Sequence, residues 1–251
     1  HNEAERFPWR GTVLAIHLVR FLSIALGSAT VWFAYRTTRL LFPNRPGLVM
    51  GTMSLLIFTP QFLFISASVN NDNAVIFFST LSLYLFSDYV LNDRRRQRLI
   101  LLGIASGLAA LSKISGLGLI PLMLFGLAWH RLQRHRSQDA STKWLAEYVR
   151  DVAYVLLSAL AIAGWWYLRN RILYGQWTGL DTMLDVFGRR ETMPDLAELF
   201  AEFRGFRMSY WGLFGIFDVL MRPQAVYWLL HAISLIALAG LIRLSVRRWP
   251  Q

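Results

Sequence analysis

Long apolar runs recur along this chain, and they restrict what it can fold into more than any other feature. Each run is close to the ~20 residues that a helix needs to cross a hydrocarbon core of ~30 Å. Hydrophobic residues make up 55% of the chain and charged residues only 16%, whereas soluble domains carry about 25% charged residues. The sequence therefore predicts an all-α fold, a polytopic transmembrane helix bundle.

We expect about seven spans, which together form a single transmembrane domain over residues 1–251. The apolar runs predict spans at 17–41, 47–68 and 73–91, two short helices within 99–129, and further spans at 151–168 and 225–245. Pro60 is expected to kink the second span. Residues 169–224 have mixed polarity and are expected to form an interfacial segment on the outer face.

The run from Leu99 to Trp129 is too long for one ordinary span, and clusters of arginine flank both of its ends. A single helix would put one cluster on the outer side, against the tendency of basic residues to stay in cytoplasmic loops. Two short helices would put both clusters inside. We therefore predict that the run is broken into two helices that join near Lys113.

The net charge of +11 results from 26 basic and 15 acidic residues. Among the basic residues only Lys113 and Lys143 are lysines. A soluble protein with this excess would suggest nucleic-acid binding, but here the arginines lie mostly in short loops between apolar runs. The loops assigned to the inner side hold 15 of the basic residues, and seven of the other 11 lie in residues 169–224. This bias predicts a multi-pass protein of the inner (cytoplasmic) membrane with residue 1 outside. The absence of cysteine excludes disulfides and thiolate metal sites.

A tight cluster of Asx residues, Asn70 to Asn73, separates two apolar runs and includes one acid, Asp72. Asn and Asp side chains bond backbone groups in turns and at helix N-caps, so the cluster predicts a hairpin between two membrane helices. One interpretation is that these residues only form the turn and the caps. The other is that Asp72 faces a water-filled cavity and takes part in chemistry at the membrane surface.

Other polar residues are expected on the same outer face as Asp72. Lys113 and Arg169 could bind a phosphate that links a lipid to a sugar, since Arg offers planar bidentate donors and Lys a point charge. A snorkelling lysine and an arginine in contact with lipid headgroups are the alternatives. We predict Asp72 as the catalytic candidate, and the candidate substrate-binding residues are Asn70, Asn71, Lys113, Arg169, Asn170 and Trp211.

Five stretches of this chain resemble the bacterial polytopic glycosyltransferases of the GT-C superfamily, near the protein O-mannosyltransferase and aminoarabinose-transferase branch. The stretches that carry the resemblance are 17–23, 59–62 with 69–72, 107–113, 164–170 with 174–175, and 209–215. The resemblance implies transfer of a sugar from a polyprenyl-phosphate donor to an acceptor at the outer membrane face. It also implies that Asp72, in the second outer loop, acts as a helper base, holds the acceptor or binds a divalent cation.

The resemblance further implies a general base in a first outer loop, which this chain does not contain. His1 is not a start methionine and the first ten residues show no signal-peptide pattern. We expect the chain to be a fragment that is inactive by itself. Two other functions stay open from the sequence: a lipid or solute transporter or flippase, suggested by the broken helices, and a non-catalytic membrane scaffold.

Overall fold

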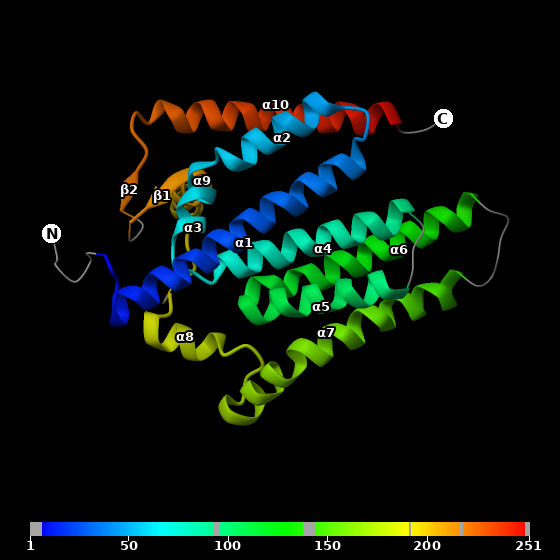
Figure 1. The fold of residues 1–251 in the computed structure, drawn as a ribbon, viewed down its shortest axis with the longest axis horizontal. Helices are drawn as coiled ribbons and strands as arrows, with labels where there is room; N and C mark the ends of the chain where they lie inside the picture. Colours follow the sequence, from blue (N-terminus) through cyan, green and yellow to red (C-terminus); the bar gives the residue numbers. More distant parts are fainter. Residues whose placement is uncertain (1–6, 93–95, 138–143, 191, 216–217, 249–251) are drawn as a thin grey trace. The chain divides into compact units, whose positions relative to one another are not determined.

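In a computed structural model the chain folds almost entirely into helices (Figure 1). The structure describes residues 7–92, 96–137, 144–190, 192–215 and 218–248. These residues form two compact units, which we describe one at a time. Unit 1 comprises the described residues up to 57 and residues 65–189, and unit 2 comprises residues 58–64 and those from 190 onward. A single transmembrane domain over residues 1–251 stays a prediction.

Unit 1 is a bundle of helices joined by short connections. Its elements are α1 (Gly11–Leu41), α2 (Pro46–Ile57), α4 (Asp72–Asn92), α5 (Arg96–Ser112), a 3-10 turn η2 (Ile114–Gly118), α6 (Leu119–Ser137), α7 (Trp144–Tyr174) and α8 (Leu180–Phe187). The short helix α3 (Pro60–Ala67) is divided between the two units.

The described helices confirm a multi-pass membrane protein, but with fewer spans than seven. Five segments are long and apolar enough to cross a membrane: α1, α4, the stretch Ile114–His135, α7 and the C-terminal helix. A sixth is present if α2 and α3 count as one broken span. The helix that falls short is α5, whose 17 residues cover only about 26 Å at 1.5 Å per residue.

Two predicted helix breaks are present in the structure. The second apolar run is interrupted directly before Pro60, which begins α3 at a position where its missing N–H costs nothing. The run from 99 to 129 is broken after Ser112, and α6 begins only at Leu119. The prediction of two helices that join near Lys113 is confirmed.

The core of unit 1 lies around α5, which packs between α4 and α7. Figure 1 shows α4, α5 and α6 running side by side with α7 beside them. The buried core residues are Tyr84, Leu85 and Tyr89 of α4, Leu99, Leu102 and Ala105 of α5, Met123 and Leu127 of α6, and Val155 of α7. By contrast, large side chains on the outward faces stay exposed, among them Phe125 at 68% and Leu157 at 66%. Such faces suit contact with lipid tails.

Two glycines let α5 approach α7 closely. A Cβ added to Gly103 would overlap the backbone carbonyl of Val155, and one added to Gly107 would lie 2.9 Å from the carbonyl oxygen of Ala159. Glycines four residues apart line one face of a helix, and in lipid such faces drive association by close backbone packing. The α5–α7 contact therefore depends on residues without side chains.

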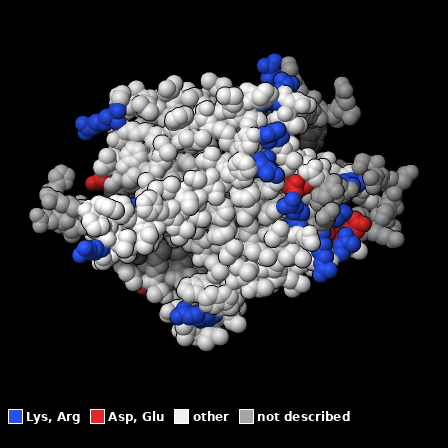
Figure 2. Space-filling model, viewed as in Figure 1, with Lys and Arg blue, Asp and Glu red and all other residues white. Residues whose placement is uncertain are grey.

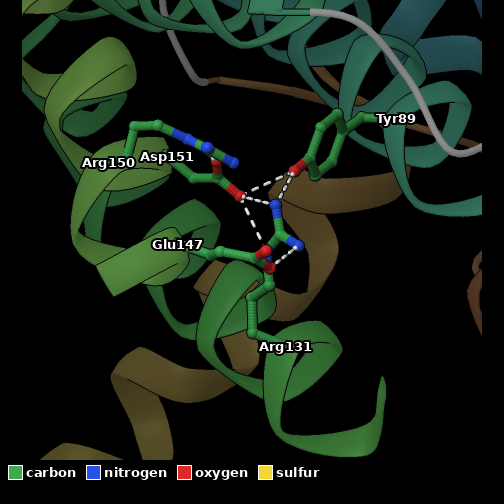
Figure 3. Close-up of polar contacts among 5 residues, drawn as sticks. All are labelled: Tyr89, Arg131, Glu147, Arg150 and Asp151. Atoms are coloured by element: carbon green, nitrogen blue, oxygen red, sulfur yellow. Dashed lines mark hydrogen bonds and ion pairs between the residues drawn. The ribbon is translucent and has the colours of Figure 1, made fainter. Parts of the chain in front are cut away.

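A buried ionic cluster joins α4, α6 and α7 (Figure 3). The Arg131 guanidinium donates to Asp151 Oδ2 at 2.5 and 2.9 Å, to Glu147 Oε2 at 2.7 Å and to the Tyr89 hydroxyl at 2.8 Å. Tyr89 in turn donates to Asp151 Oδ2 at 2.6 Å. Asp151 is only 1% exposed. Every polar group at the centre has a partner, which is the condition under which a buried charge is tolerated.

This cluster lies at the end of unit 1 where most of its charged contacts occur. Asp88, near the end of α4, pairs with Arg98, near the start of α5, at 2.8 Å. Arg36, near the end of α1, donates to the Tyr84 hydroxyl at 3.1 Å. Figure 2 shows a broad uncharged surface with charged side chains collected near its edges. We name the end of unit 1 that holds Arg36, Arg98 and Arg131 the basic end. The directions of the helices put the start of α4 at the opposite end.

Unit 2 contains α9 (Leu196–Gly212), the strands β1 (Leu213–Phe214) and β2 (Val219–Leu220), and α10 (Ala225–Arg248). α9 begins two residues after Pro194, because Asp195 forms a capping box with Glu198. The two strands pair antiparallel, with Leu213 opposite Leu220. Gln61 of α3 accepts a hydrogen bond from the Leu213 amide at 2.8 Å.

The close packing of α5 on α7 predicts that Gly103→Ala lowers the stability of the protein. The new methyl group would press on the Val155 backbone, which cannot move aside as a flexible side chain could, and overpacking of this kind costs about 1–3 kcal/mol. The matched control is Gly51→Ala in α2, where a Cβ meets open space. Thermal unfolding in detergent should show a lower midpoint for the first variant alone. Equal midpoints would contradict the packing argument.

The ionic cluster predicts different costs for two neighbouring carboxylates. Asp151→Asn leaves the buried guanidinium without its main counter-charge, and breaking a buried ion pair costs about 3–5 kcal/mol. Glu147→Gln is the same chemical change one turn away on a side chain that is 45% exposed, where an ion pair contributes about 0–1 kcal/mol. Unfolding in detergent measures both variants. A loss for Glu147→Gln as large as that for Asp151→Asn would refute the assignment.

Candidate functional site

The hairpin between α3 and α4 is built by its own asparagines. The Asn73 side chain is buried and donates to the carbonyl oxygens of Ile65 at 2.8 Å and Ser68 at 3.1 Å. The Asn70 side chain accepts a hydrogen bond from the Asp72 amide at 2.9 Å. These two residues do what turn and cap residues do. Asn70 was expected to bind substrate; in the structure its side-chain oxygen is engaged in the turn.

Asp72 and Lys113 meet at this end of unit 1. The ammonium nitrogen of Lys113 lies 2.5 Å from Asp72 Oδ1. Their side chains are 41% and 26% exposed, for Lys113 and Asp72 respectively, so both can be reached by solvent. The side-chain amide of Asn71 also donates to the Ser112 carbonyl oxygen at 3.2 Å. The start of α4 and the end of α5 are thus joined by two polar contacts, one of them ionic.

Local backbone structure holds this pair in place. Asp72 stands in the first turn of α4, where the partial positive charge of the helix terminus favours a carboxylate. Lys113 follows the last residue of α5 in an extended conformation, with φ −158° and ψ 146°. Its amide still donates to Ala109 at 3.1 Å. The helix break therefore puts a cation at the end of the bundle, beside the hairpin.

Arg169 and Asn170 lie near the same end of unit 1 but do not join the pair. The Tyr167 hydroxyl donates to the Ala110 carbonyl oxygen at 2.8 Å, which sets this part of α7 level with the end of α5. The Arg169 guanidinium stacks on the Trp166 ring at 5.2 Å. Asn170 is buried, and its amide is 3.5 Å from the Trp177 carbonyl oxygen. No contact from either side chain to Asp72 or Lys113 occurs among the described residues.

Trp211 belongs to unit 2. It lies in the last turn of α9. The centroid of its ring is 4.9 Å from that of Tyr210, which it meets edge-on, and 6.5 Å from that of His231. Its expected role as a substrate-binding residue stays a prediction.

The Asp72–Lys113 pair can do two kinds of chemistry. A carboxylate can accept a proton or a hydrogen bond from a substrate hydroxyl, and an ammonium group can bind a phosphate as a point charge. An anion that reaches Lys113 would compete with Asp72 for it. Across the described residues, no group of three or more His, Asp or Glu side chains could hold a metal ion. The side chains of Asp72 and Lys113 themselves offer proton transfer and anion binding.

The sequence analysis did not identify the cluster around Arg131. It treated the arginines as loop charges that set the orientation and considered no partner for Asp151. A signal was available, because ionisable residues inside membrane helices are rare and usually pair with each other. Asp88 and Asp151 each lie within such a helix, and each has an arginine partner. These residues are at the basic end, away from the Asp72–Lys113 pair.

Comparison with known proteins gives one match. No curated protein matches the chain. No solved structure matches it either. The sequence profile of the dolichyl-phosphate-mannose-protein mannosyltransferase family matches residues 14–166, which is more than half of the chain and includes both Asp72 and Lys113. The match supports a glycosyltransferase that uses a polyprenyl-phosphate sugar donor, as the resemblance implied. The chain therefore belongs to the dolichyl-phosphate-mannose-protein mannosyltransferase family, within the GT-C glycosyltransferases.

Proposed function

We propose that this protein transfers a sugar from a polyprenyl-phosphate donor to an acceptor at the outer face of the inner (cytoplasmic) membrane, and that Asp72 and Lys113 lie in its active site. The observation that carries the proposal is the 2.5 Å contact between these two side chains. The pair is open to solvent, lies at the end of unit 1 opposite the basic end, and falls within the residues that match the family.

The charges of unit 1 support the outer-face assignment. Arginine and lysine stay preferentially in cytoplasmic loops. At the basic end lie Arg36, Arg39, Arg98 and Arg131, near the termini of three helices, α1, α5 and α6. If this end faces the cytoplasm, the Asp72–Lys113 pair faces outward.

In the proposed reaction Lys113 binds the phosphate of the donor. The phosphate is the leaving group when the bond to the sugar breaks, so a fixed positive charge stabilises it as negative charge develops. Asp72, released from Lys113, accepts a hydrogen bond from the acceptor hydroxyl and assists its deprotonation. Arg169 is the second candidate for the phosphate, since its stacked guanidinium lies near the same end of the bundle.

The roles of the pair are tested by two substitutions in the full-length protein. Asp72→Asn keeps the shape of the side chain but removes the base, and general-base catalysis contributes about a hundredfold or more to the rate. We expect kcat to fall while the KM for the donor changes little. Lys113→Gln should instead raise the KM for the donor, because the loss of one charge-assisted phosphate contact costs about 1.5–3 kcal/mol, or roughly ten- to a hundredfold.

Asp185→Asn serves as the matched control, because Asp185 is an exposed acid on α8 that pairs with Arg189 at 2.8 Å, one turn away. Transfer is measured with a polyprenyl-phosphate sugar in membranes. If Asp72→Asn and Lys113→Gln both transfer sugar at the parental rate, the pair is not in the active site. If no variant and no parental protein transfers sugar, a non-catalytic scaffold is the better description.

The orientation is tested separately by labelling of single cysteines, since the chain has none of its own. A cysteine at Gln176, just after α7, should react with an impermeant maleimide in intact cells. One at Arg45, between α1 and α2, should react only after the membrane is permeabilised. The reverse pattern would put the Asp72–Lys113 pair on the cytoplasmic side.

A further inference from the structure

Unit 2 contains a pocket of about 350 Å³ between α9 and the start of α10. That volume is within the range of pockets that hold small molecules or headgroups. The residues that line it are Phe200, Phe203, Arg204, Arg207, Met208, Gln224, Tyr227 and Trp228. Aromatic and cationic side chains thus dominate it, and none of the described residues that line it is acidic.

Two arginines give the pocket its charge. Arg204 and Arg207 are three residues apart on α9, which puts them on the same face of the helix. Neither has a carboxylate partner among the described residues, whereas nearby Arg190 forms an ion pair with Glu202. The pocket therefore carries uncompensated positive charge.

One donor in the pocket has no acceptor. The Nε atom of Arg207 is buried without a hydrogen-bond partner within the described part of the chain. The guanidinium is held against the Trp228 ring at 5.1 Å, which limits the directions in which it can turn. A buried polar group without a partner costs free energy, so its presence favours a ligand that supplies an oxygen at this point.

The walls of the pocket and the surface around it indicate what kind of anion fits. On α9 the large apolar side chains of Phe200 and Phe206 are 75% and 70% exposed, as in helices that lie in a membrane interface. α10 is a candidate membrane span. A free phosphate would make no use of these aromatic surfaces, whereas a lipid would cover them with its tails.

We propose that the pocket formed by Arg204, Arg207, Gln224 and Trp228 binds the phosphate group of a membrane lipid. The two guanidinium groups and the Gln224 amide donate hydrogen bonds to phosphate oxygens, and Arg207 Nε gains the acceptor that it lacks. The lipid tails lie against the exposed aromatic side chains of α9. The proposal rests on residues of unit 2 and does not depend on the roles proposed for Asp72 and Lys113.

Native mass spectrometry of the full-length protein in neutral detergent tests the site with defined probes. We expect dioleoyl phosphatidic acid to bind at least tenfold more tightly than dioleoylglycerol, which has the same tails but no phosphate. Arg207→Gln should weaken phosphatidic acid binding by about tenfold, the effect of one charge-assisted contact. Arg204→Gln should act in the same direction. The thermal midpoint of each variant shows whether it is folded.

Arg222→Gln is the matched control, because Arg222 is an exposed arginine of unit 2 that does not line the pocket. An equal loss with this variant would indicate unspecific charge attraction and overturn the proposal. Equal binding of dioleoylglycerol, or an unchanged affinity in folded Arg207→Gln and Arg204→Gln, would do the same. Glycerol 3-phosphate bound as tightly as the lipid would make the ligand a soluble phosphate. A polyprenyl phosphate bound more tightly than phosphatidic acid would support the site and name its lipid.

Discussion

The close packing of α5 on α7 determines the rest of unit 1. Because Gly103 and Gly107 have no side chains, the two backbones come together without a layer of side chains between them. In lipid the hydrophobic effect does not drive helices together, so contacts of this kind and interhelical hydrogen bonds provide the attraction. The position of α5 along α7 then fixes where α5 ends. The hydrogen bond from the Tyr167 hydroxyl to the Ala110 carbonyl oxygen shows which part of α7 lies beside the end of α5.

The level of α5 also determines what meets at the two ends of the bundle. At one end, the extended backbone after α5 brings Lys113 to the first turn of α4, where Asp72 lies. At the other end, Arg131 binds residues from α4 and α7 in a cluster whose centre solvent hardly reaches. The second cluster is suited to stability, because all of its central groups are satisfied and Asp151 is buried. The first remains open, so a substrate can exchange for one of its partners.

Much of this arrangement follows from the sequence. The signals that predicted it are the positions of basic residues and of helix-breaking residues, not the periodicity of apolar residues. Basic residues at both ends of the 99–129 run predicted the helix break, and Pro60 predicted the other one. The same reasoning put Asp72 and Lys113 on one side of the membrane. It could not tell which side chains would touch, because helices that are apolar all round give no periodic signal of which face is buried. Thus the sequence analysis grouped Arg169 with Asp72 and Lys113 but could not indicate that its guanidinium stacks on Trp166, and it missed Asp151.

The contrast between exposed and buried ion pairs also bears on how substitutions should be read. A variant of Asp151 that loses activity is expected to do so by loosening the bundle. This carboxylate is 1% exposed and bonds Tyr89 near the end of α4, whereas Asp72 lies at the start of that helix. A variant of Asp72 removes a partly exposed pair, which contributes little to stability. Loss of transfer with an unchanged unfolding midpoint is therefore a strong criterion for a direct role of Asp72. Stability measurements made beside each activity assay separate the two ends of the bundle by their physical function.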